Sequence, residues 1–167
     1  MKILFKITTD LLTQMRADLA RPHAFAHERV GFISAGVASV GRDIIVLARS
    51  YRAVDDDDYI EDRSVGAMMG REAIRKSLEW AMQQRHAIFH VHTHGGHGVP
   101  GFSGVDIREN RKFIPDFFKV APQCVHGALV LGDTAARGQV WLERHGRDFP
   151  IDDFVQVGAS LMKWRPS

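Results

Sequence analysis

The sequence predicts an α/β fold in a single domain spanning residues 1–167, and three observations support this prediction. A chain of this length is most simply one domain with one core. Hydrophobic residues make up 45% of it and charged residues 25%, which is the usual composition of a folded globular protein. Short apolar runs, typical of strands, alternate with longer segments in which apolar residues recur every three or four positions, as in helices.

Strand and helix patterns alternate through the first half of the chain. The predicted strands are residues 2–7, 30–37, 44–48 with a continuation toward 54, and 59–60. The predicted helices are residues 10–19, capped by Thr9 or Asp10 and ended by Pro22, and residues 66–84. Between them, the four carboxylates of Asp55–Asp58 favour an exposed, self-repelling loop over a metal site or a site for a basic partner.

The second half begins with a buried strand that leads into a group of histidines. The apolar run Ala87-Ile88-Phe89 predicts this strand, which continues to His94. The next predicted element is a helix at 107–114, with a kink or a new helical turn at Pro115. Strands at 125–131 and 139–142 are predicted to form a hairpin through the polar connection 132–138. The structure of the tail, 150–167, is left open. A strand, a helix and a strand with polar residues at its carboxyl end is α/β organisation.

The histidines have a spacing that suits metal binding. The chain has nine, and four of them fall between residues 90 and 97. Side chains at i and i+2 of a strand share a face, so His92 and His94 can direct two imidazoles at one point. A glycine-rich turn then leads to Ser103-Gly104-Val105-Asp106, a helix start with Ser103 at the N-cap. Two imidazoles and the Asp106 carboxylate leave a fourth tetrahedral position open, as in catalytic zinc sites, although residue type alone also admits iron, manganese or nickel.

These residues resemble the motif of the JAB/MPN (JAMM) metalloprotease family. That motif is a glutamate at the start of a glycine-containing strand, then His-x-His, then Ser-x-x-Asp. Here Glu28 precedes the strand that contains Gly31, and His92-Thr93-His94 and Ser103 to Asp106 follow in order. The resemblance covers roughly residues 9–142. It implies a three-layer, cytidine-deaminase-like fold with a central mixed β-sheet flanked by helices, and the compact chain looks like the prokaryotic, stand-alone branch.

The chain departs from the family pattern in the turn after the histidines. Eight residues separate His94 from Ser103, where the family usually has seven, and Gly95 stands where a proline is common. A turn rich in glycine can absorb one extra residue as a bulge. Pairing His90 with His92 instead would lengthen the gap by two more, so the pair His92 and His94 is preferred. His90 lies on the same strand face, as a supporting group or a substitute ligand, and His97 is expected to face substrate or solvent.

The resemblance implies a role for each residue of the motif. His92, His94 and Asp106 would bind Zn²⁺, and a water in the fourth position would be acidified by the metal. Glu28 would act as general base toward that water and then as general acid toward the leaving amine. Ser103 would donate a hydrogen bond to the oxyanion of the tetrahedral intermediate. This chemistry hydrolyses an amide without an acyl-enzyme.

The implied function is that of a zinc-dependent peptidase or isopeptidase. Its expected substrate is the C-terminal tail of a ubiquitin-like protein or of its conjugate, with conjugation enzymes from the same operon as further partners. An extended tail of this kind can add as a strand beside an active site. Two alternatives stay open: a non-catalytic MPN scaffold for protein assembly, and a different histidine-metal hydrolase acting on a small molecule. The intact motif with Glu28 argues against the scaffold.

Composition argues against other classes of partner. The formal net charge is only +2, and no dense basic run suggests nucleic-acid binding. The single cysteine, Cys124, cannot form an internal disulfide. The apolar run at the N-terminus is too short for a signal peptide, and no later run approaches membrane-spanning length. A cytoplasmic location without a membrane partner is therefore expected.

Overall fold

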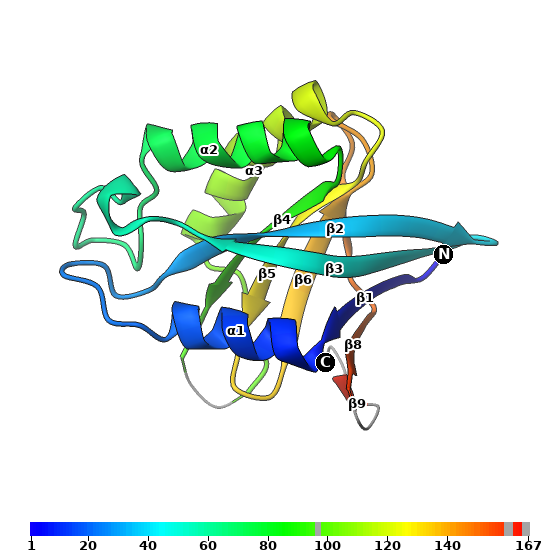
Figure 1. Cartoon of the computed structure of the whole chain (residues 1–167), viewed down its shortest axis with the longest axis horizontal. Helices are drawn as coiled ribbons and strands as arrows, with labels where there is room; N and C mark the ends of the chain where they lie inside the picture. Colours follow the sequence, from blue (N-terminus) through cyan, green and yellow to red (C-terminus); the bar gives the residue numbers. More distant parts are fainter. Residues whose placement is uncertain (96–97, 159–161, 165–167) are drawn as a thin grey trace.

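The computed structural model describes residues 1–95, 98–158 and 162–164. Within these ranges nine strands form one mixed sheet, in the order β7-β6-β5-β4-β2-β3-β1-β8-β9 (Figure 1). The strands are β1 (Ile3–Thr8), β2 (Val30–Val40), β3 (Asp43–Ala53), β4 (Ala87–Thr93), β5 (His126–Leu131), β6 (Ala136–Trp141), β7 (Asp148–Pro150), β8 (Asp153–Val157) and β9 (Met162–Trp164). The helices are α1 (Thr9–Leu19), α2 (Arg71–Gln84) and α3 (Gly104–Val120), with a 3₁₀ turn η1 (Asp56–Asp58).

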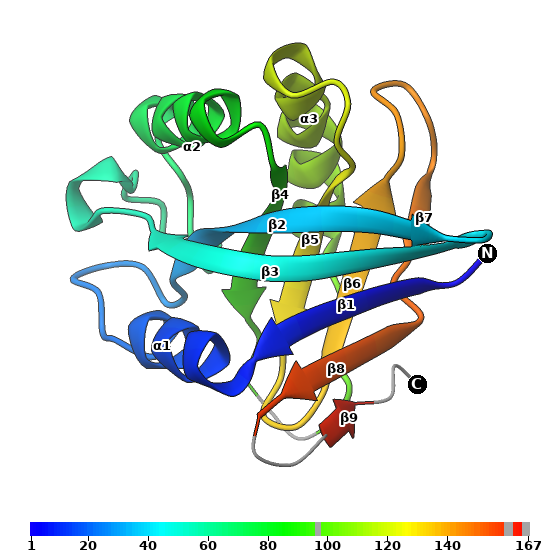
Figure 2. The ribbon, with the colours of Figure 1, turned by 45° about the vertical axis from the view of Figure 1, so that its right-hand side comes forward.

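Helices cover both faces of the sheet, α1 on one side and α2 and α3 on the other (Figure 2). Leu12, Met15 and Leu19 of α1 recur at the spacing of one helical face, and they pack on the strands from β1 to β5. Trp80 of α2 and Phe117 of α3 pack against β2 and β4 from the opposite side. The predicted α/β class is therefore confirmed, with helices on both faces of a mixed sheet. Its assignment to the JAB/MPN fold stays a prediction.

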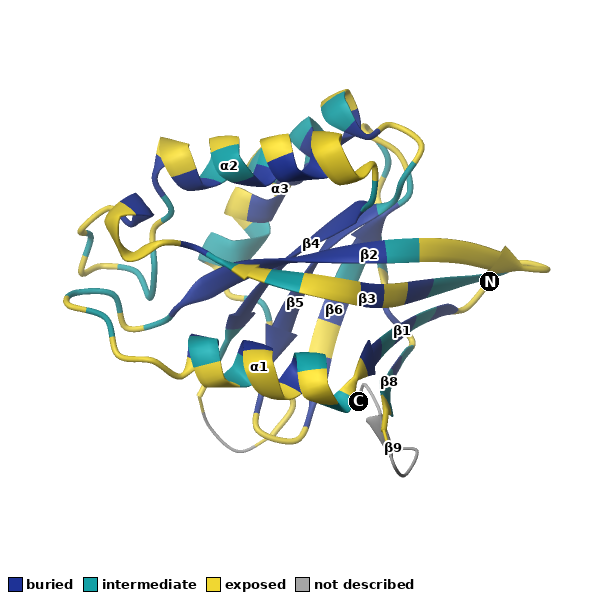
Figure 3. Cartoon of the chain, viewed as in Figure 1, coloured by how far each residue is buried: buried dark blue, intermediate teal, exposed yellow. Residues whose placement is uncertain are grey.

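Strand β4, which carries the histidines, lies inside the sheet. Strand β5 runs parallel to it on one side and β2 antiparallel on the other. Its residues from Ala87 to His92 are buried, as the dark colour of β4 in Figure 3 shows. The register pairs His92 with Val30, so the carboxyl end of β4 lies beside the start of β2. This pairing brings the segment that precedes β2, including Glu28, to the edge where the histidines emerge.

The strand predicted at 30–37 is confirmed and is longer than predicted, and the strand predicted at 44–48 continues toward residue 54 as expected. Together β2 and β3 form a long hairpin that turns at Gly41, whose φ of +61° lies in the left-handed region that favours glycine. The register shifts at Ser34 and Ala35, which marks a bulge. The end of the hairpin near its turn is exposed on β2 (Figure 3).

Two helix starts differ from the prediction. Thr8, and neither Thr9 nor Asp10, caps α1, because its hydroxyl accepts a hydrogen bond from the backbone N–H of Leu11 at 3.3 Å. Helix α2 begins at Arg71, not at residue 66. The residues before it are held by a bridge between Tyr59 and Met69 and by Gly70 N–H, which donates to the carbonyl of Asp58 at 2.7 Å. The short strand predicted at 59–60 is thus reduced to that single bridge.

Helix α3 passes through Pro115 and continues to Val120, where the sequence predicted a kink or a new turn. Proline removes one helical hydrogen bond, which tertiary packing can offset. Ile114 on one side of Pro115 and Phe117 and Phe118 on the other are all buried against the sheet. These contacts hold both parts of the helix on the same surface.

The acidic run at 55–58 is exposed at Asp55, Asp56 and Asp57, as predicted, but it is not self-repelling. Its residues lie at η1, and three of the four carboxylates have cationic partners. Asp55 and Asp58 both accept from Lys76 Nζ, at 2.6 and 2.7 Å, and Asp56 pairs with Arg29. The partners come from distant segments, and only the fold brings them beside the run.

The tail, for which no structure was predicted, extends the sheet on the far side of β1. Strand β8 pairs with β1 in parallel, and the carboxylate of Asp152 accepts from the backbone N–H of Ile3 at 2.7 Å. The hairpin predicted at 125–142 is confirmed as β5 and β6, although β6 begins at Ala136, inside the segment expected to be a connection. None of the helices in the described part of the chain is long and apolar enough to cross a membrane.

Candidate metal centre

The four residues expected at the metal centre come together at one edge of the sheet. His92 lies in β4, and His94 follows the strand with its backbone N–H donating to Leu131 of β5 at 3.0 Å. Asp106 lies in the first turn of α3, and Glu28 precedes β2. His92 is buried, whereas the side chains of His94 and Glu28 are 24% and 30% exposed. The edge is therefore buried on its inner side and partly exposed on its outer side.

The distances within this group fit a tetrahedral metal site. Nε2 of His92 lies 3.2 Å from Nε2 of His94. One carboxylate oxygen of Asp106 lies 3.5 Å from Nε2 of His92, and the other lies 3.5 Å from Nε2 of His94. Ligand atoms around a tetrahedral zinc, with bonds of about 2.1 Å, are about 3.4 Å apart. Each of the three separations is close to that value, and the two from Asp106 are measured from its two different carboxylate oxygens.

Glu28 lies beside the three ligands and slightly farther out. Its Oε1 is 3.8 Å from Nε2 of His94. One ligand atom each from Glu28, His92 and His94 lies within 4.8 Å of the others, so this triad could also hold a metal ion. The donor set of imidazoles and carboxylates suits zinc among other metals. Glu28 is placed either to complete the coordination or to meet a water in the open position.

Ser103 and Asp106 form a capping box at the helix start that the sequence predicted. Asp106 Oδ2 accepts from the backbone N–H of Ser103 at 2.6 Å, and Ser103 Oγ accepts from the backbone N–H of Asp106 at 3.1 Å. Burial would raise the pKa of the Asp106 carboxyl, but hydrogen bonds from His92 and Ser103 hold that pKa well below its usual range. Asp106 is thus fixed in direction and anionic. The Ser103 hydroxyl still has its own proton to donate.

The backbone of Gly66 holds Glu28 in place. Its carbonyl accepts hydrogen bonds from the N–H groups of His27 and Glu28, at 2.8 and 3.0 Å. The carboxylate of Glu28 lies directly over the glycine, because a Cβ at residue 66 would lie 2.5 Å from Oε2 of Glu28. Gly66 therefore holds the backbone of the candidate base and leaves room for its carboxylate.

A buried arginine anchors the same segment on its other side. The side chain of Arg29 is 2% exposed, and its guanidinium donates to both oxygens of Asp56, at 2.7 and 3.1 Å. It also donates to the backbone carbonyls of Arg21 and Pro22, each at 2.9 Å. The hydrogen bond from Arg29 lowers the pKa of the Asp56 carboxyl. Glu28 therefore directly precedes a residue whose side chain is held by four hydrogen bonds.

The sequence did not predict which residues hold the segment around Glu28. Gly66, Arg29 and Asp56 carry no local pattern that links them to the histidines. The only signal was the acidic run at 55–58, in which one carboxylate meets a buried cation. Such a pairing depends on the tertiary fold.

His90 is not one of the converging ligands. It lies behind His92, with ring centroids 5.4 Å apart, between the rings of Phe32 and Phe113. Burial lowers the pKa of His90 to about 3, so the ring is neutral at physiological pH. The prediction for His97 lies outside the described residues.

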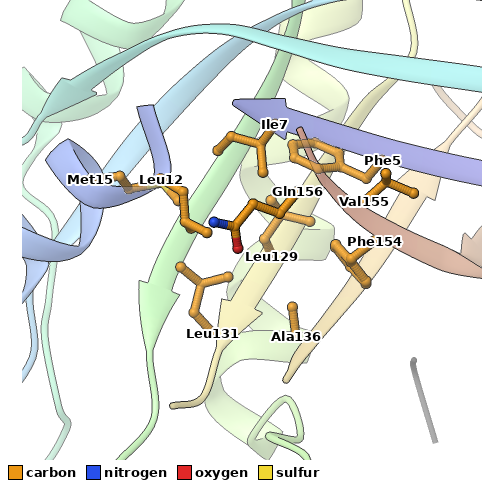
Figure 4. Close-up of a pocket in the computed structure, with 10 residues that line it drawn as sticks. All are labelled: Phe5, Ile7, Leu12, Met15, Leu129, Leu131, Ala136, Phe154, Val155 and Gln156. Atoms are coloured by element: carbon orange, nitrogen blue, oxygen red, sulfur yellow. The ribbon is translucent and has the colours of Figure 1, made fainter. Parts of the chain in front are cut away.

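Two cavities lie elsewhere in the molecule. Figure 4 shows an apolar one of about 20 Å³ under α1, lined by side chains such as Leu12, Met15 and Leu129, which is too small for a ligand. The other, of about 270 Å³, lies between β2, β3, η1 and α2, with Asp55, Asp58 and Lys76 among its lining residues. Neither is lined by the four residues of the metal centre.

Comparison with known proteins identifies no family. No protein-family model matches the sequence, and no curated protein matches it. Among solved structures, the N-terminal domain of STIL from Trichoplax adhaerens is similar over 82% of this chain and 40% of that chain, with a TM-score of 0.39 and 10% sequence identity. The chain thus spans less than half the length of that structure. A likeness at this level says nothing about activity.

Proposed function

We propose that this protein is a zinc-dependent peptidase or isopeptidase of the JAMM type. The observation that carries the proposal is the convergence of His92, His94 and Asp106 at ligand-to-ligand distances of 3.2 to 3.5 Å, with the Glu28 carboxylate 3.8 Å from His94. A chance cluster of polar side chains would rarely reproduce both the sequence order and this geometry. The family assignment itself rests on the resemblance of the motif.

The protein residues fit zinc on chemical grounds as well as on distance. Two imidazole nitrogens 3.2 Å apart repel each other unless a proton or a cation lies between them. The anionic Asp106, held by the N–H of Ser103, adds the charge that favours a cation there. Zinc bound by these three residues would supply a water of lowered pKa and would polarise the carbonyl of the scissile amide.

Glu28 then performs the proton transfers. Its carboxylate accepts a proton from the attacking water and delivers it to the nitrogen of the leaving amine. For this the carboxylate must stay close to the ligands without entering the core, and the contacts of Gly66 and Arg29 hold the backbone segment that carries it. Ser103 donates its hydroxyl proton as a hydrogen bond to the developing oxyanion, a contribution of about 3 kcal/mol where such donors have been removed from other enzymes.

The proposed substrate is the C-terminal tail of a ubiquitin-like protein or of its conjugate. The partly exposed outer side of the site, formed by His94 and Glu28, gives an extended chain access to the ligands. The substrate class follows from the family resemblance, as do the conjugation enzymes proposed as partners. A scaffold without catalysis would have no need of a carboxylate fixed beside the ligands.

Three measurements test the proposal. Purified protein should contain one zinc per chain, and Asp106→Ala should lose it. The wild type should cleave a ubiquitin-like fusion at its C-terminal amide and should leave a phosphodiester substrate intact, whereas Glu28→Gln should keep zinc and lose turnover. Glu79→Gln, a change of the same kind at an exposed position on α2, is the control and should behave as wild type. Full activity of Glu28→Gln, or cleavage of the phosphodiester alone, would refute the proposal.

A further inference from the structure

Four buried polar atoms behind the metal centre have no hydrogen-bond partner among the described residues. They are both ring nitrogens of His90, Nδ1 of His92 and Nδ2 of Asn110. The three residues are 6%, 1% and 1% exposed. A buried polar group left unpaired destabilises the folded state, and native proteins satisfy nearly all such groups. Four of them on three residues need a physical explanation.

The three residues lie together between β4 and α3. His90 and His92 are two positions apart on β4 and share a face of the strand, with their rings inclined by 32°. Asn110 lies one helical turn after Asp106 and is in range to interact with His90, although outside hydrogen-bond geometry. Phe32 and Phe113 form apolar walls around the His90 ring. The result is a small polar cluster in an apolar surrounding, immediately behind a metal ligand.

The chemistry of His92 explains why polar groups lie behind it. Nε2 of His92 faces His94 and Asp106, so Nδ1 must carry the ring proton when Nε2 binds a metal. Metal-binding histidines donate that second N–H to an acceptor, which fixes the orientation of the ring. Neutral His90 offers an acceptor nitrogen, and Asn110 offers an amide donor. A water with these three neighbours makes three hydrogen bonds, the usual number for a buried water.

We propose that His90, Asn110 and Nδ1 of His92 bind one internal water, and that this network positions the His92 ring for the metal. The water accepts from His92 Nδ1–H and from Asn110 Nδ2–H, and it donates to one ring nitrogen of His90, so it pairs three of the four atoms. His90 and Asn110 are then positioning residues, which act on the metal through His92. The inference rests on the proposed function only in taking zinc as the metal.

His126 is a buried histidine whose hydrogen bonding differs from that of His90, and it provides a control. This buried histidine on β5 has both nitrogens engaged: Nδ1 accepts from the N–H of Ile88 at 3.1 Å, and Nε2 lies 3.0 Å from the carbonyl of Ala121. A histidine with a purely structural role is thus fully paired within the protein. His126→Phe removes a buried imidazole of the same kind without touching the proposed water.

The experiment measures zinc affinity without substrate, by chelator competition. His90→Phe and Asn110→Leu should each weaken zinc binding 10- to 100-fold, whereas His90→Gln, which keeps an acceptor, should recover most of it. His126→Phe should bind zinc as wild type does, whatever its effect on stability. In the zinc-loaded wild type, the Nδ1 proton of His92 should give a slowly exchanging NMR signal that both weakened variants lose.

The outcomes separate this inference from the proposed function. Wild-type zinc affinity in both His90→Phe and Asn110→Leu would overturn it, as would a high-resolution structure of the zinc-loaded protein without a water between the three residues. If one variant fails to fold, the other carries the same expectation. A protein that binds zinc in this way but cleaves no amide would refute the peptidase proposal and support the network. A wild type that binds no zinc would overturn both.

Discussion

Replacing Gly66 with alanine should displace the candidate base while leaving the metal ligands in place. The added Cβ would lie 2.5 Å from Oε2 and 2.6 Å from Cδ of Glu28, whereas ordinary contact begins near 3.4 Å. The carboxylate must therefore retreat by about 0.9 Å. It is the free end of a flexible side chain, so the movement costs the fold little. The backbone of Gly66 has no positive φ that would strain alanine.

The expected effect is a loss of turnover without a loss of zinc. A misplacement of about 1 Å in a catalytic group can cost about 10²-fold in rate, so kcat on a ubiquitin-like fusion should fall about 100-fold. Zinc affinity, measured by chelator competition, should be unchanged, because Gly66 does not contact the three ligands. The free energy of unfolding in urea should stay within about 1 kcal/mol of the wild type.

Gly101→Ala is the matched control, because no atom lies within 4 Å of the Cβ that it would add. It should leave turnover, zinc affinity and stability unchanged. If Gly66→Ala hydrolysed the substrate at the wild-type rate, the position of Glu28 would not matter for the reaction, and its role as base would be refuted. If the variant lost zinc instead, Glu28 would have to be counted as a metal ligand.

Three further predictions concern the support of the site and of the fold. Ser103→Ala should lower kcat about 100-fold with zinc retained, and loss of the helix cap should lower the free energy of unfolding by about 1 kcal/mol. Unchanged kinetics would leave Ser103 only its capping role. Asp56→Asn leaves the buried Arg29 without its carboxylate and should lower the free energy of unfolding by about 2 kcal/mol in urea titrations, whereas an unchanged midpoint would mean that the backbone carbonyls suffice. Burial lowers the pKa of His126 to about 4, below the usual 6.5, so its contribution to stability is present above pH 6.5 and is lost as the pH falls toward 4. Between pH 7.5 and 5 the metal-free wild type should therefore lose about 2 kcal/mol more than His126→Phe, and equal losses would contradict this assignment.

The sequence by itself determined the features that depend on near neighbours. The alternation of His92 and His94 on an extended strand places both rings on one face, whatever surrounds the strand. Ser103 and Asp106 form a capping box because both atoms of each bond lie within one helical turn. The apolar period of α1 likewise reports which side of that helix is buried. These local patterns were sufficient to predict the α/β class and three of the candidate ligands.

Only the tertiary structure decided which distant segments meet. Residue 28 lies beside the histidines because β2 pairs antiparallel with β4, and Gly66 and Asp56 hold it there from other loops. The pairing of β8 with β1, the partners of the acidic run and the passage of α3 through Pro115 depend in the same way on surfaces far apart in the sequence. The physical reason is that a local sequence pattern reflects only which side of a helix or strand is apolar. A contact between distant segments contributes free energy only when the rest of the fold brings the two segments together, and no local pattern contains that information.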